Sequence, residues 1–550
     1  MARATRYSKE MIEEYTRRGV WTTETQADIW DRNAGKLPDK EALVDSRGRL
    51  SWAEAALWTD RIALHLLDMG FSKDDAVVVQ LPTSKELLMM LIACEKAGLI
   101  YIPVMYGFRE KELGYVIGKT RARGIVIPWK FRNVDYFEMV QKLRPEFPHL
   151  QFIIFCDDEH PHGSMSLNEL AERAIEKKYS PDHLKHTVMS PFEVSFVRAT
   201  SGTTGMPKLV ELPSCCRVFQ GRTLVRVLDM KESDVVAAVS PVAGGPNTVP
   251  YLGAPMAGAK IVMLQRWDPE EALKLIEREG VTLFSAVPAQ LFQMVQHPDF
   301  SKYDLGSLRV AVGTGGQALS YELGIEVEEK LNCPILNVFG ATEWGGTLMS
   351  SPLDPRERRL RTVGKCSDKS EVKIVDVHDD ELPPGEVGEL LLGGPAASSG
   401  YFKDVKGTQT IWTEDGWLRT GDMARLDDEG NVVICGRIKD MIVRGGFNIY
   451  PREIENLLVT CPKVADAAVV GMPDPVMGEK LCAYVSLREG ESISFAEMVA
   501  FLQENGLIAY KIPERLECMS KLPLGLTGEK IDKAALRRDI ERKLKAEGIT

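Results

Sequence analysis

The sequence predicts an α/β protein: a large N-terminal region with two similar α/β subdomains and a small β-rich subdomain, then a small α+β domain. Two observations support this prediction. Short apolar strand patterns alternate with longer helical patterns through the first part of the chain, and short strands separated by turns replace them from Val372. With 550 residues, the chain is also too long for a single hydrophobic core.

The alternation of strands and helices begins near residue 75. Runs such as "DAVVVQLP" and "LIYIPVMY" are apolar and rich in β-branched residues, which is typical of strands in a buried parallel sheet. The longer patterns that follow them, "SKELLMMLIACEKAG" and "REKELGYVIGKT", are typical of helices. The same rhythm returns in residues 259–332, from "AKIVML" to "SYELGIEVEEKLN". Two similar α/β halves are therefore expected.

The β-rich part is expected in "EVKIVDVHDDELPPGEVGELLLGG" and "GNVVICGR", which ends at Arg437. Beyond it, "REIENLLVTCP", "VADAAVVGMP", "EKLCAYVSL" and "FAEMVAFLQENG" alternate helices and strands over a length typical of a separate small domain. We therefore expect one domain over residues 1–437 and a second over residues 438–550, joined by a short hinge.

Composition excludes several classes of protein. The net charge of −11 argues against nucleic acid or an anionic membrane as the main partner. The first 19 residues alternate charges, so no secretory signal is expected there, and the apolar run "LLMMLIAC" is far shorter than the roughly 20 residues of a membrane span. The ten cysteines form no C-x-x-C pair, which favours a reducing cytoplasm and no structural zinc site.

The stretch "TSGTTGMPK", from Thr200 to Lys208, follows the apolar run "FEVSFVRA" and has the composition of a phosphate-binding loop. Its glycines allow close approach of the backbone to an anion, its hydroxyls donate hydrogen bonds, and its lysine supplies a positive charge. An ordinary Gly/Ser/Thr surface loop is the alternative. A Walker A loop is excluded because Pro207 precedes the lysine and Leu209 follows it.

Five further motifs follow in order: "GTGG" at Gly313, "NVFGATE" ending at Glu343, "WLRTGD" ending at Asp422, "GRIKDMIVRGGFNIYPREIE" from Gly436 and "LTGEKIDKAAL" containing Lys530. Over nearly the whole chain, this series resembles the adenylate-forming superfamily of acyl- and aryl-CoA ligases, adenylation domains and luciferases. The resemblance implies an enzyme that joins a carboxylic acid to AMP, using ATP and Mg²⁺, and then transfers the acyl group to a thiol.

The resemblance also implies roles for individual residues. The first loop would grip the β- and γ-phosphates of ATP through Thr200, Ser201, Gly202, Thr203, Thr204, Gly205 and Lys208. Glu343 would hold Mg²⁺, a hard cation that prefers oxygen ligands, and Thr342 would contact the α-phosphate. Without the motif, Glu343 would be any acidic residue at the start of a helix.

The nucleotide's base and ribose are expected at the later motifs. Gly315, Gly316, Phe339 and the adjacent Gly340 would flank adenine. Asp422 would accept hydrogen bonds from both ribose hydroxyls, a task suited to a carboxylate, although "TGD" is also typical of a turn.

The last two motifs are expected to serve different steps: Lys530 acts during adenylation, and Gly445 and Gly446 act during transfer to the thiol. Arg437 would contact ribose or phosphate, and the smaller domain would pivot at Lys439. Lys530 would stabilise the charge that develops during adenylation, although a lone lysine in "GEKIDK" would otherwise be a solvated surface charge. After rotation, Gly445 and Gly446 would line the path of the thiol, where a side chain would obstruct it.

The likeness is strongest to stand-alone enzymes that activate 2,3-dihydroxybenzoate, but it fails at the acid pocket. Where that group has Ala-His-Asn, this chain reads "SPVAGGPNTVPY", with Gly244 and Gly245 in place of the histidine and asparagine. A pocket without the hydroxyl-recognising side chain argues against a catechol acid. We expect a bulky, apolar cyclic carboxylic acid, with Trp344 as an apolar wall and Asn247 as a partial substitute for the missing asparagine.

Coenzyme A is the expected thiol acceptor, and a separate carrier protein, as in siderophore synthesis, is the alternative. A catalytically inactive adenylate-binding sensor is a rival of another class. It is disfavoured because the charged positions Lys208, Glu343, Asp422, Arg437 and Lys530 are all intact.

Overall fold

The structure is a computed structural model of the whole chain. It describes residues 4–157, 159–162, 164–200, 206–240, 245–314, 321–345, 348–366, 369–525 and 531–548.

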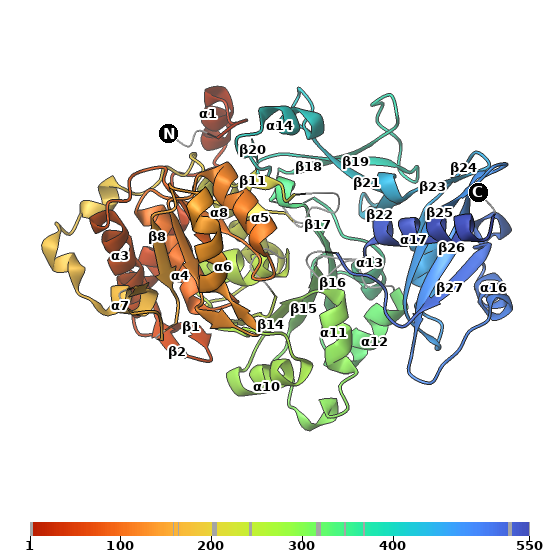
Figure 1. The fold of residues 1–550 in the computed structure, drawn as a ribbon, viewed down its shortest axis with the longest axis horizontal. Coiled ribbons are helices and arrows are strands. Elements are labelled where there is room, and N and C mark those ends of the chain that lie inside the picture. The colour runs from red at the N-terminus through yellow and green to blue at the C-terminus, as the bar shows by residue number, and fades with distance from the viewer. Residues whose placement is uncertain are drawn as a thin grey trace.

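Two parallel sheets form the body of the N-terminal region (Figure 1). The larger has eight strands within the described residues, and all neighbours are parallel except at the two edges. Its order is β17 (Leu348–Met349), β16 (Ile335–Phe339), β15 (Val310–Thr314), β14 (Leu283–Ala286), β12 (Val235–Ala238), β13 (Lys260–Met263), β1 (Glu41–Asp45) and β2 (Gly48–Ser51). The other has the order β4 (Ile100–Pro103), β3 (Ala76–Val79), β5 (Gly124–Ile127), β8 (Phe152–Phe155) and β9 (Met165–Ser166).

Helices cover both sheets, as the alternating pattern predicts. The connecting helices named in the sequence pattern are α4 (Lys85–Lys96), α5 (Glu110–Thr120), α10 (Pro269–Glu279) and α12 (Tyr321–Leu331). Other helices of this region are α2 (Gln26–Lys36), α3 (Trp52–Asp68), α6 (Tyr136–Leu143), α8 (Ser214–Val227) and α11 (Pro288–Val295). The prediction of two α/β subdomains is confirmed.

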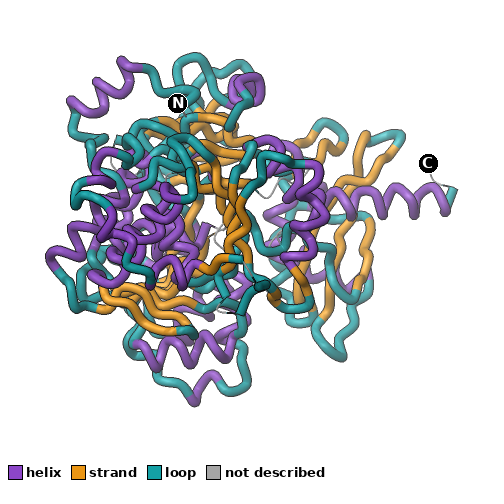
Figure 2. Tube along the Cα trace, turned by 60° about the vertical axis from the view of Figure 1, so that its left-hand side comes forward, coloured by secondary structure: helices purple, strands orange, loops and turns teal. Residues whose placement is uncertain are grey.

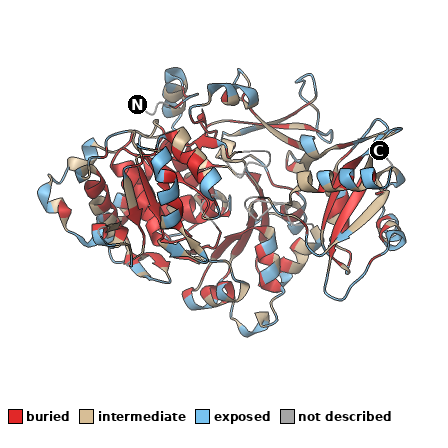
Figure 3. Cartoon of the chain, viewed as in Figure 1, coloured by how far each residue is buried: buried red, intermediate tan, exposed pale blue. Residues whose placement is uncertain are grey.

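Helix α4 contains the longest apolar run of the sequence and is buried along its whole length, including its charged residues (Figure 3). The prediction that this run is a buried helix is therefore confirmed. Among the described helices, none combines the length and apolar character needed to cross a membrane.

A hairpin of β6 (Lys130–Phe131) and β7 (Val134–Asp135) and two further antiparallel sheets complete the described part of the N-terminal region. The two further sheets have three and four strands. One consists of β10 (Val197–Ala199), β11 (Leu209–Glu211) and β20 (Gly400–Tyr401), and the other of β18 (Glu371–Val375), β19 (Gly388–Gly393), β21 (Leu418–Leu426) and β22 (Val432–Arg437). The run before Thr200 forms a strand only over β10, which is shorter than the sequence pattern predicts.

The C-terminal part has its own five-stranded sheet and lies at one end of the molecule (Figures 1 and 2). Its strands are β23 (Ile442–Arg444), β24 (Phe447–Ile449), β25 (Val464–Asp474), β26 (Gly478–Leu487) and β27 (Arg515–Met519). Its helices are α15 (Pro451–Leu458), α16 (Phe495–Glu504) and α17 (Lys533–Ala546). Strands β22 and β23 belong to different sheets, so the chain passes between them in residues 438–441.

Helix α17 contacts this connecting segment directly. The Arg537 guanidinium donates hydrogen bonds to the carbonyl oxygen of Lys439 at 3.1 Å and to Asp440 Oδ1 at 3.2 Å. The connecting segment itself forms a single 3-10 turn over Ile438–Asp440. The last helix of the chain therefore holds the start of the C-terminal part.

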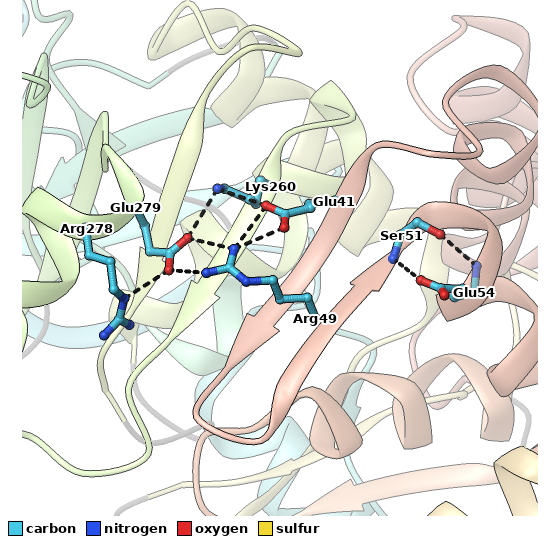
Figure 4. Close-up of polar contacts among 7 residues, drawn as sticks. All are labelled: Glu41, Arg49, Ser51, Glu54, Lys260, Arg278 and Glu279. Atoms are coloured by element: carbon cyan, nitrogen blue, oxygen red, sulfur yellow. Dashed lines mark hydrogen bonds and ion pairs between the residues drawn. The ribbon is translucent and has the colours of Figure 1, made fainter.

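An ion-pair network fastens α10 to the edge of the largest sheet (Figure 4). Arg49 Nη2 lies 2.7 Å from Glu279 Oε1, and Lys260 Nζ lies 3.4 Å from Glu279 Oε2. Glu41 and Arg278 join the same cluster. Nearby, the Ser51 N–H donates to Glu54 at 2.8 Å as part of the capping box that begins α3. Burial raises the pKa of Glu279, but the hydrogen bonds from Arg49 and Arg278 outweigh burial and lower this pKa to about 2.

Glu279→Gln is expected to lower the free energy of unfolding at pH 7 by about 1–2 kcal/mol, because three cations lose a common partner. The pKa of Glu279 is lower in the folded state, so its contribution is complete above the ordinary value of 4.5 and is lost as the pH falls toward 2. Urea unfolding at several pH values should show the gap between wild type and variant closing on acidification. A gap that stays constant down to pH 3 would contradict this account.

Candidate active site

The predicted phosphate loop connects the two strands of an antiparallel hairpin, β10 and β11. At its base, the Thr200 N–H donates to the carbonyl oxygen of Lys208 at 2.8 Å, and the Lys208 N–H donates to Thr200 Oγ1 at 3.2 Å. These two bonds close the loop, so both of its ends are fixed. Lys208 is exposed, and Ser201, Gly202, Thr203, Thr204 and Gly205 lie outside the described residues.

One face of this small sheet brings a cation and a carboxylate together. Val210 pairs with Arg198 on one side and with Tyr401 on the other, so the side chains of these three residues lie on the same face. The Lys208 ammonium lies 5.3 Å from the centre of the Tyr401 ring. The Tyr401 hydroxyl donates a hydrogen bond to Glu343 Oε1 at 3.0 Å. Burial and the Glu343 carboxylate raise the pKa of Tyr401, so its hydroxyl remains a donor.

Glu343 is positioned by the turn that follows the parallel strand β16. It lies in the 3-10 turn η7 (Thr342–Trp344), whose last residue is 1% exposed and donates from its indole N–H to the Gly393 carbonyl at 3.2 Å. The Ser398 N–H donates to the Glu343 carbonyl oxygen at 2.9 Å. Trp344 therefore anchors the turn in the core, while the Glu343 and Thr342 side chains stay partly exposed.

The residues predicted around adenine are only partly described. Phe339 ends β16 and is half-buried, and Gly340 follows it on the surface. Gly315 and Gly316 lie outside the described residues.

Asp422 and Arg437 face each other across the strands β21 and β22. The Arg437 Nε–H donates to Asp422 Oδ1 at 3.0 Å, and the carboxylate is 8% exposed whereas the arginine side chain is 41% exposed. The preceding Gly421 has φ +69°, a left-handed conformation that favours glycine in this turn. Burial and the Arg437 charge lower the pKa of Lys439, two residues further along.

The segment predicted to bind the acid forms a buried turn. Gly245 begins the 3-10 turn η4 (Gly245–Asn247), and a π-helical turn η5 (Val249–Gly253) follows. Asn247 is 1% exposed, and its amide donates to the Ser240 carbonyl oxygen at 2.5 Å. Asn247 thus holds its own loop, and Gly244 lies outside the described residues.

The glycines predicted to line the thiol path lie in the exposed hairpin between β23 and β24. Gly445 has φ +56° and Gly446 has φ +87°. A Cβ atom at Gly445 would lie 2.4 Å from the Met477 methyl group, so a larger residue would also collide there. Lys530 lies outside the described residues, and nearby Lys533 forms an ion pair with buried Glu455 at 2.5 Å.

A cavity of about 630 Å³ separates α15 from the N-terminal region. Arg425, Ile434, Arg452 and Asn456 are among its lining residues. Burial lowers the pKa of Arg452, and the negative charges of Glu455 and Asp422 oppose this effect. None of the predicted site residues that the structure describes lines this cavity.

Tyr401 is the functional candidate that the sequence did not reveal. It belongs to no motif, and only the pairing of β20 with β11 brings it beside Lys208 and Glu343. About 190 residues separate Tyr401 from Lys208 along the chain, and no local pattern indicates that such distant segments pair. The sequence therefore carries no signal that could have found this residue.

Tyr401→Phe removes the hydroxyl that orients Glu343 while preserving the ring beside Lys208. We expect the rate of acid-dependent pyrophosphate release to fall about 10-fold, which corresponds to the loss of one hydrogen bond to a charged group. The apparent affinity for Mg²⁺ should change with it, and Tyr303→Phe, which removes a surface hydroxyl from Glu270, is the matched control. An unchanged rate and an unchanged Mg²⁺ dependence would contradict a role for Tyr401.

The whole sequence and the fold are similar to those of known proteins. The sequence profile of the family described as AMP-binding enzyme matches residues 30–402, and that of the AMP-binding enzyme C-terminal domain matches residues 453–529. The chain is 33% identical over 546 residues to a 2,3-dihydroxybenzoate-AMP ligase of Bacillus subtilis, covering 98% of each chain.

Two further similarities are to proteins whose names print coenzyme A as a substrate. The chain is 33% identical to a 2-hydroxy-7-methoxy-5-methyl-1-naphthoate–CoA ligase of Streptomyces carzinostaticus, with 95% of this chain and 94% of the relative covered. The fold matches the crystal structure of an anthranilate CoA ligase in complex with anthranoyl-AMP, with a TM-score of 0.84 and 23% identity, over 95% of this chain and 98% of that one.

Proposed function

The chain belongs to the AMP-binding enzyme family, and from this premise we propose that it is a carboxylate–CoA ligase for a bulky cyclic carboxylic acid. The family establishes the coarser statement: the chain is an AMP-forming ligase that uses ATP. The identity of the acid, the use of coenzyme A and the roles of individual residues belong to the proposal.

One observation supports the proposal most directly. Lys208, Tyr401 and Glu343 lie together at the base of the predicted phosphate loop, so a cation and a carboxylate are held beside the same ring. Adenylation brings two anions together, a carboxylate and a triphosphate, and requires a site that reduces their repulsion. In the proposed first step, a carboxylate oxygen bonds to the α-phosphorus of ATP while the bond to the bridging oxygen breaks and pyrophosphate leaves.

The residues present fit a magnesium ion. The Tyr401 hydroxyl donates its hydrogen bond to Glu343 Oε1, and among the described residues no hydrogen bond is made to Oε2. No group of three or more His, Cys, Asp or Glu side chains that could hold a metal occurs in the described part of the chain. Mg²⁺ suits such a site because it is commonly held by one carboxylate, water and substrate phosphates. When bound, the ion would neutralise phosphate charge, and Glu343 is the residue that we propose holds it.

The remaining residues have proposed roles in binding and in the second step. Asp422 and Arg437 would bind the ribose side of the nucleotide, and Lys530 would stabilise charge at the α-phosphate. A thiol sulfur would then bond to the acyl carbon as the carbon–oxygen bond to AMP breaks and AMP leaves. We propose that rotation at Lys439 brings Gly445 and Gly446 to the active site for this step, because both lie exposed in the present arrangement.

Coenzyme A is the proposed acceptor, and a carrier protein is the second candidate. The similarity to a 2,3-dihydroxybenzoate-AMP ligase favours the second candidate, and the similarity to a naphthoate–CoA ligase favours the first. In the acid pocket, Gly245 offers no side chain for recognising a hydroxyl, and Asn247 uses its amide within its own loop. Both points favour an acid other than a catechol.

A panel of carboxylic acids, assayed for AMP and pyrophosphate with coenzyme A present or omitted, tests the proposal. We expect acid-dependent pyrophosphate release, and AMP release that increases when coenzyme A is added. AMP release only with a carrier protein would overturn the acceptor, and selective use of 2,3-dihydroxybenzoate would overturn the acid class. No pyrophosphate release with any acid would overturn the ligase assignment at this site.

A further inference from the structure

Two arginines lie beside the candidate active site. Their guanidinium groups make no hydrogen bond to the described residues. Arg198 is in strand β10, two residues before the predicted phosphate loop, and Arg217 is in helix α8. Arg217 is 5% exposed, and its Nη1 is enclosed without a hydrogen-bond partner among these residues, as is Nε of Arg198.

The surroundings of the two guanidinium groups balance their charge only in part. Arg217 lies 4.1 Å above the Phe196 ring, and Arg198 lies 5.6 Å from it. The negative charge of the buried Glu95 carboxylate raises the pKa of Arg217. Glu95 itself accepts hydrogen bonds from Ser195, Ser214 and the Ala27 N–H. Burial is the main cause that lowers the pKa of both arginines to about 10, and the Arg198 charge adds to the lowering at Arg217.

The position of the pair relative to the reacting centre follows from the hairpin. Arg198 lies on the same sheet face as Tyr401, which contacts Lys208 and Glu343. A strand rises by about 3.4 Å per residue, so Arg198 begins roughly 7 Å along the strand from Thr200. Arg198 is only partly exposed, and both Arg198 and the buried Arg217 lie against the Phe196 ring. The two guanidinium groups thus share one aromatic neighbour, close to the start of the predicted phosphate loop.

The pair also adjoins the segment proposed to bind the acid. Tyr101 lies close enough to interact electrostatically with Arg198, with Arg217 and with Tyr251. Tyr251 is in the π-helical turn η5 that follows Asn247, and α8, which carries Arg217, packs against this turn. The arginines therefore adjoin the segment that is proposed to bind the acid.

Burying two cations without hydrogen bonds is costly, and proteins rarely retain such groups without a partner. A carboxylate is the partner that guanidinium groups bind best, because two N–H donors match its two oxygens. We propose that the acid substrate carries a second carboxylate, which Arg198 and Arg217 bind. This inference rests on the proposed ligase function and replaces the expectation of a wholly apolar acid by a dicarboxylic acid.

The test compares acids that differ only in the second carboxylate. Terephthalate and isophthalate are expected to support pyrophosphate release with a kcat/KM about 10- to 100-fold above that of benzoate, as expected for hydrogen bonds between charged groups. Arg198→Met and Arg217→Met should remove this preference, with most of the loss in the KM for the dicarboxylates. Arg198→Lys, which keeps the charge but not the paired donors, should restore part of the preference.

Stability provides a readout that does not depend on activity. Without substrate, each Met variant should melt at a higher temperature than wild type, because a largely enclosed cation that lacks hydrogen bonds to the described residues has been removed. The matched control is Arg359→Met: Arg359 is also buried, but it is paired with Glu328, so its loss should lower the melting temperature without changing acid preference. Calorimetry should detect terephthalate binding to wild type without ATP, and weaker binding to both Met variants.

The outcomes separate this inference from the proposed function. Turnover of benzoate at least equal to that of both dicarboxylates, or an unchanged preference in folded Met variants, would show that the arginines are structural. Failure of every acid to release pyrophosphate would contradict the ligase function, yet calorimetry would still decide whether the arginines bind a dicarboxylate. Absence of binding heat with both dicarboxylates would overturn the inference.

Discussion

Lys530→Ala is expected to slow acyl-AMP formation by about a thousandfold, the scale of losing one group that stabilises transition-state charge. The ammonium would act only while the carboxylate attacks the α-phosphorus, because negative charge accumulates there and disappears in the product. Transfer of the acyl group from supplied acyl-AMP to coenzyme A should therefore remain within a few-fold of the wild-type rate.

Two separate measurements check this prediction. Single-turnover pyrophosphate release reports the first step, and thioester formation from synthetic acyl-AMP reports the second. Lys521→Ala, which changes an exposed lysine nine residues earlier, should leave both rates unchanged. A similar loss in both steps for Lys530→Ala would mean that this residue maintains the domain structure and does not act in adenylation alone.

Asp422→Asn is expected to raise the KM for ATP by about 10- to 100-fold, because one charged acceptor of two hydrogen bonds becomes a neutral amide. The carboxylate is enclosed and receives a hydrogen bond from Arg437, so the substitution also removes the charge that orients this arginine. Both effects weaken nucleotide binding, and neither changes the reacting carboxylate. The KM for the acid should therefore change much less.

Steady-state kinetics with each substrate varied in turn, together with direct measurement of ATP binding, would test this expectation. Asp376→Asn is the matched control, since Asp376 is also a turn aspartate and accepts N–H hydrogen bonds within its own turn. If Asp422→Asn lowered thermal stability while ATP binding stayed at the wild-type level, Asp422 would be a structural turn residue.

Much of the fold could be predicted from local patterns. Strands such as β3 and β14 are continuous apolar runs, and helix α10 begins at a capping Asp268 followed by proline, so each carries its own signal. Pairings between distant strands carry no such signal. The sequence does not indicate that β11 lies between β10 and β20, and this pairing brings Tyr401 to Lys208.

The residues near the segment proposed to bind the acid were also only partly predictable from local sequence patterns. Gly244 and Gly245 indicate lost side chains, and this observation alone predicts an apolar pocket. Arg198 and Arg217 belong to no motif, and arginines are normally expected on the surface. Their burial without hydrogen-bond partners among the described residues becomes visible only when α8 packs beside the hairpin.

The contact between Arg537 and the connecting segment restricts how the C-terminal part can reorient. Asp422 fixes the Arg437 side chain at the end of one sheet, and Arg537 holds the Lys439 carbonyl and Asp440 on the other side. A swing of the smaller domain would then be confined to the backbone torsions of Ile438 and Lys439. It would have to break the N–H···O bond from Met441 to Arg437, which spans this turn. Helix α17 would rotate together with the C-terminal part. The rotation would therefore occur about one point, the connecting segment between the sheet of β22 and the sheet of β23.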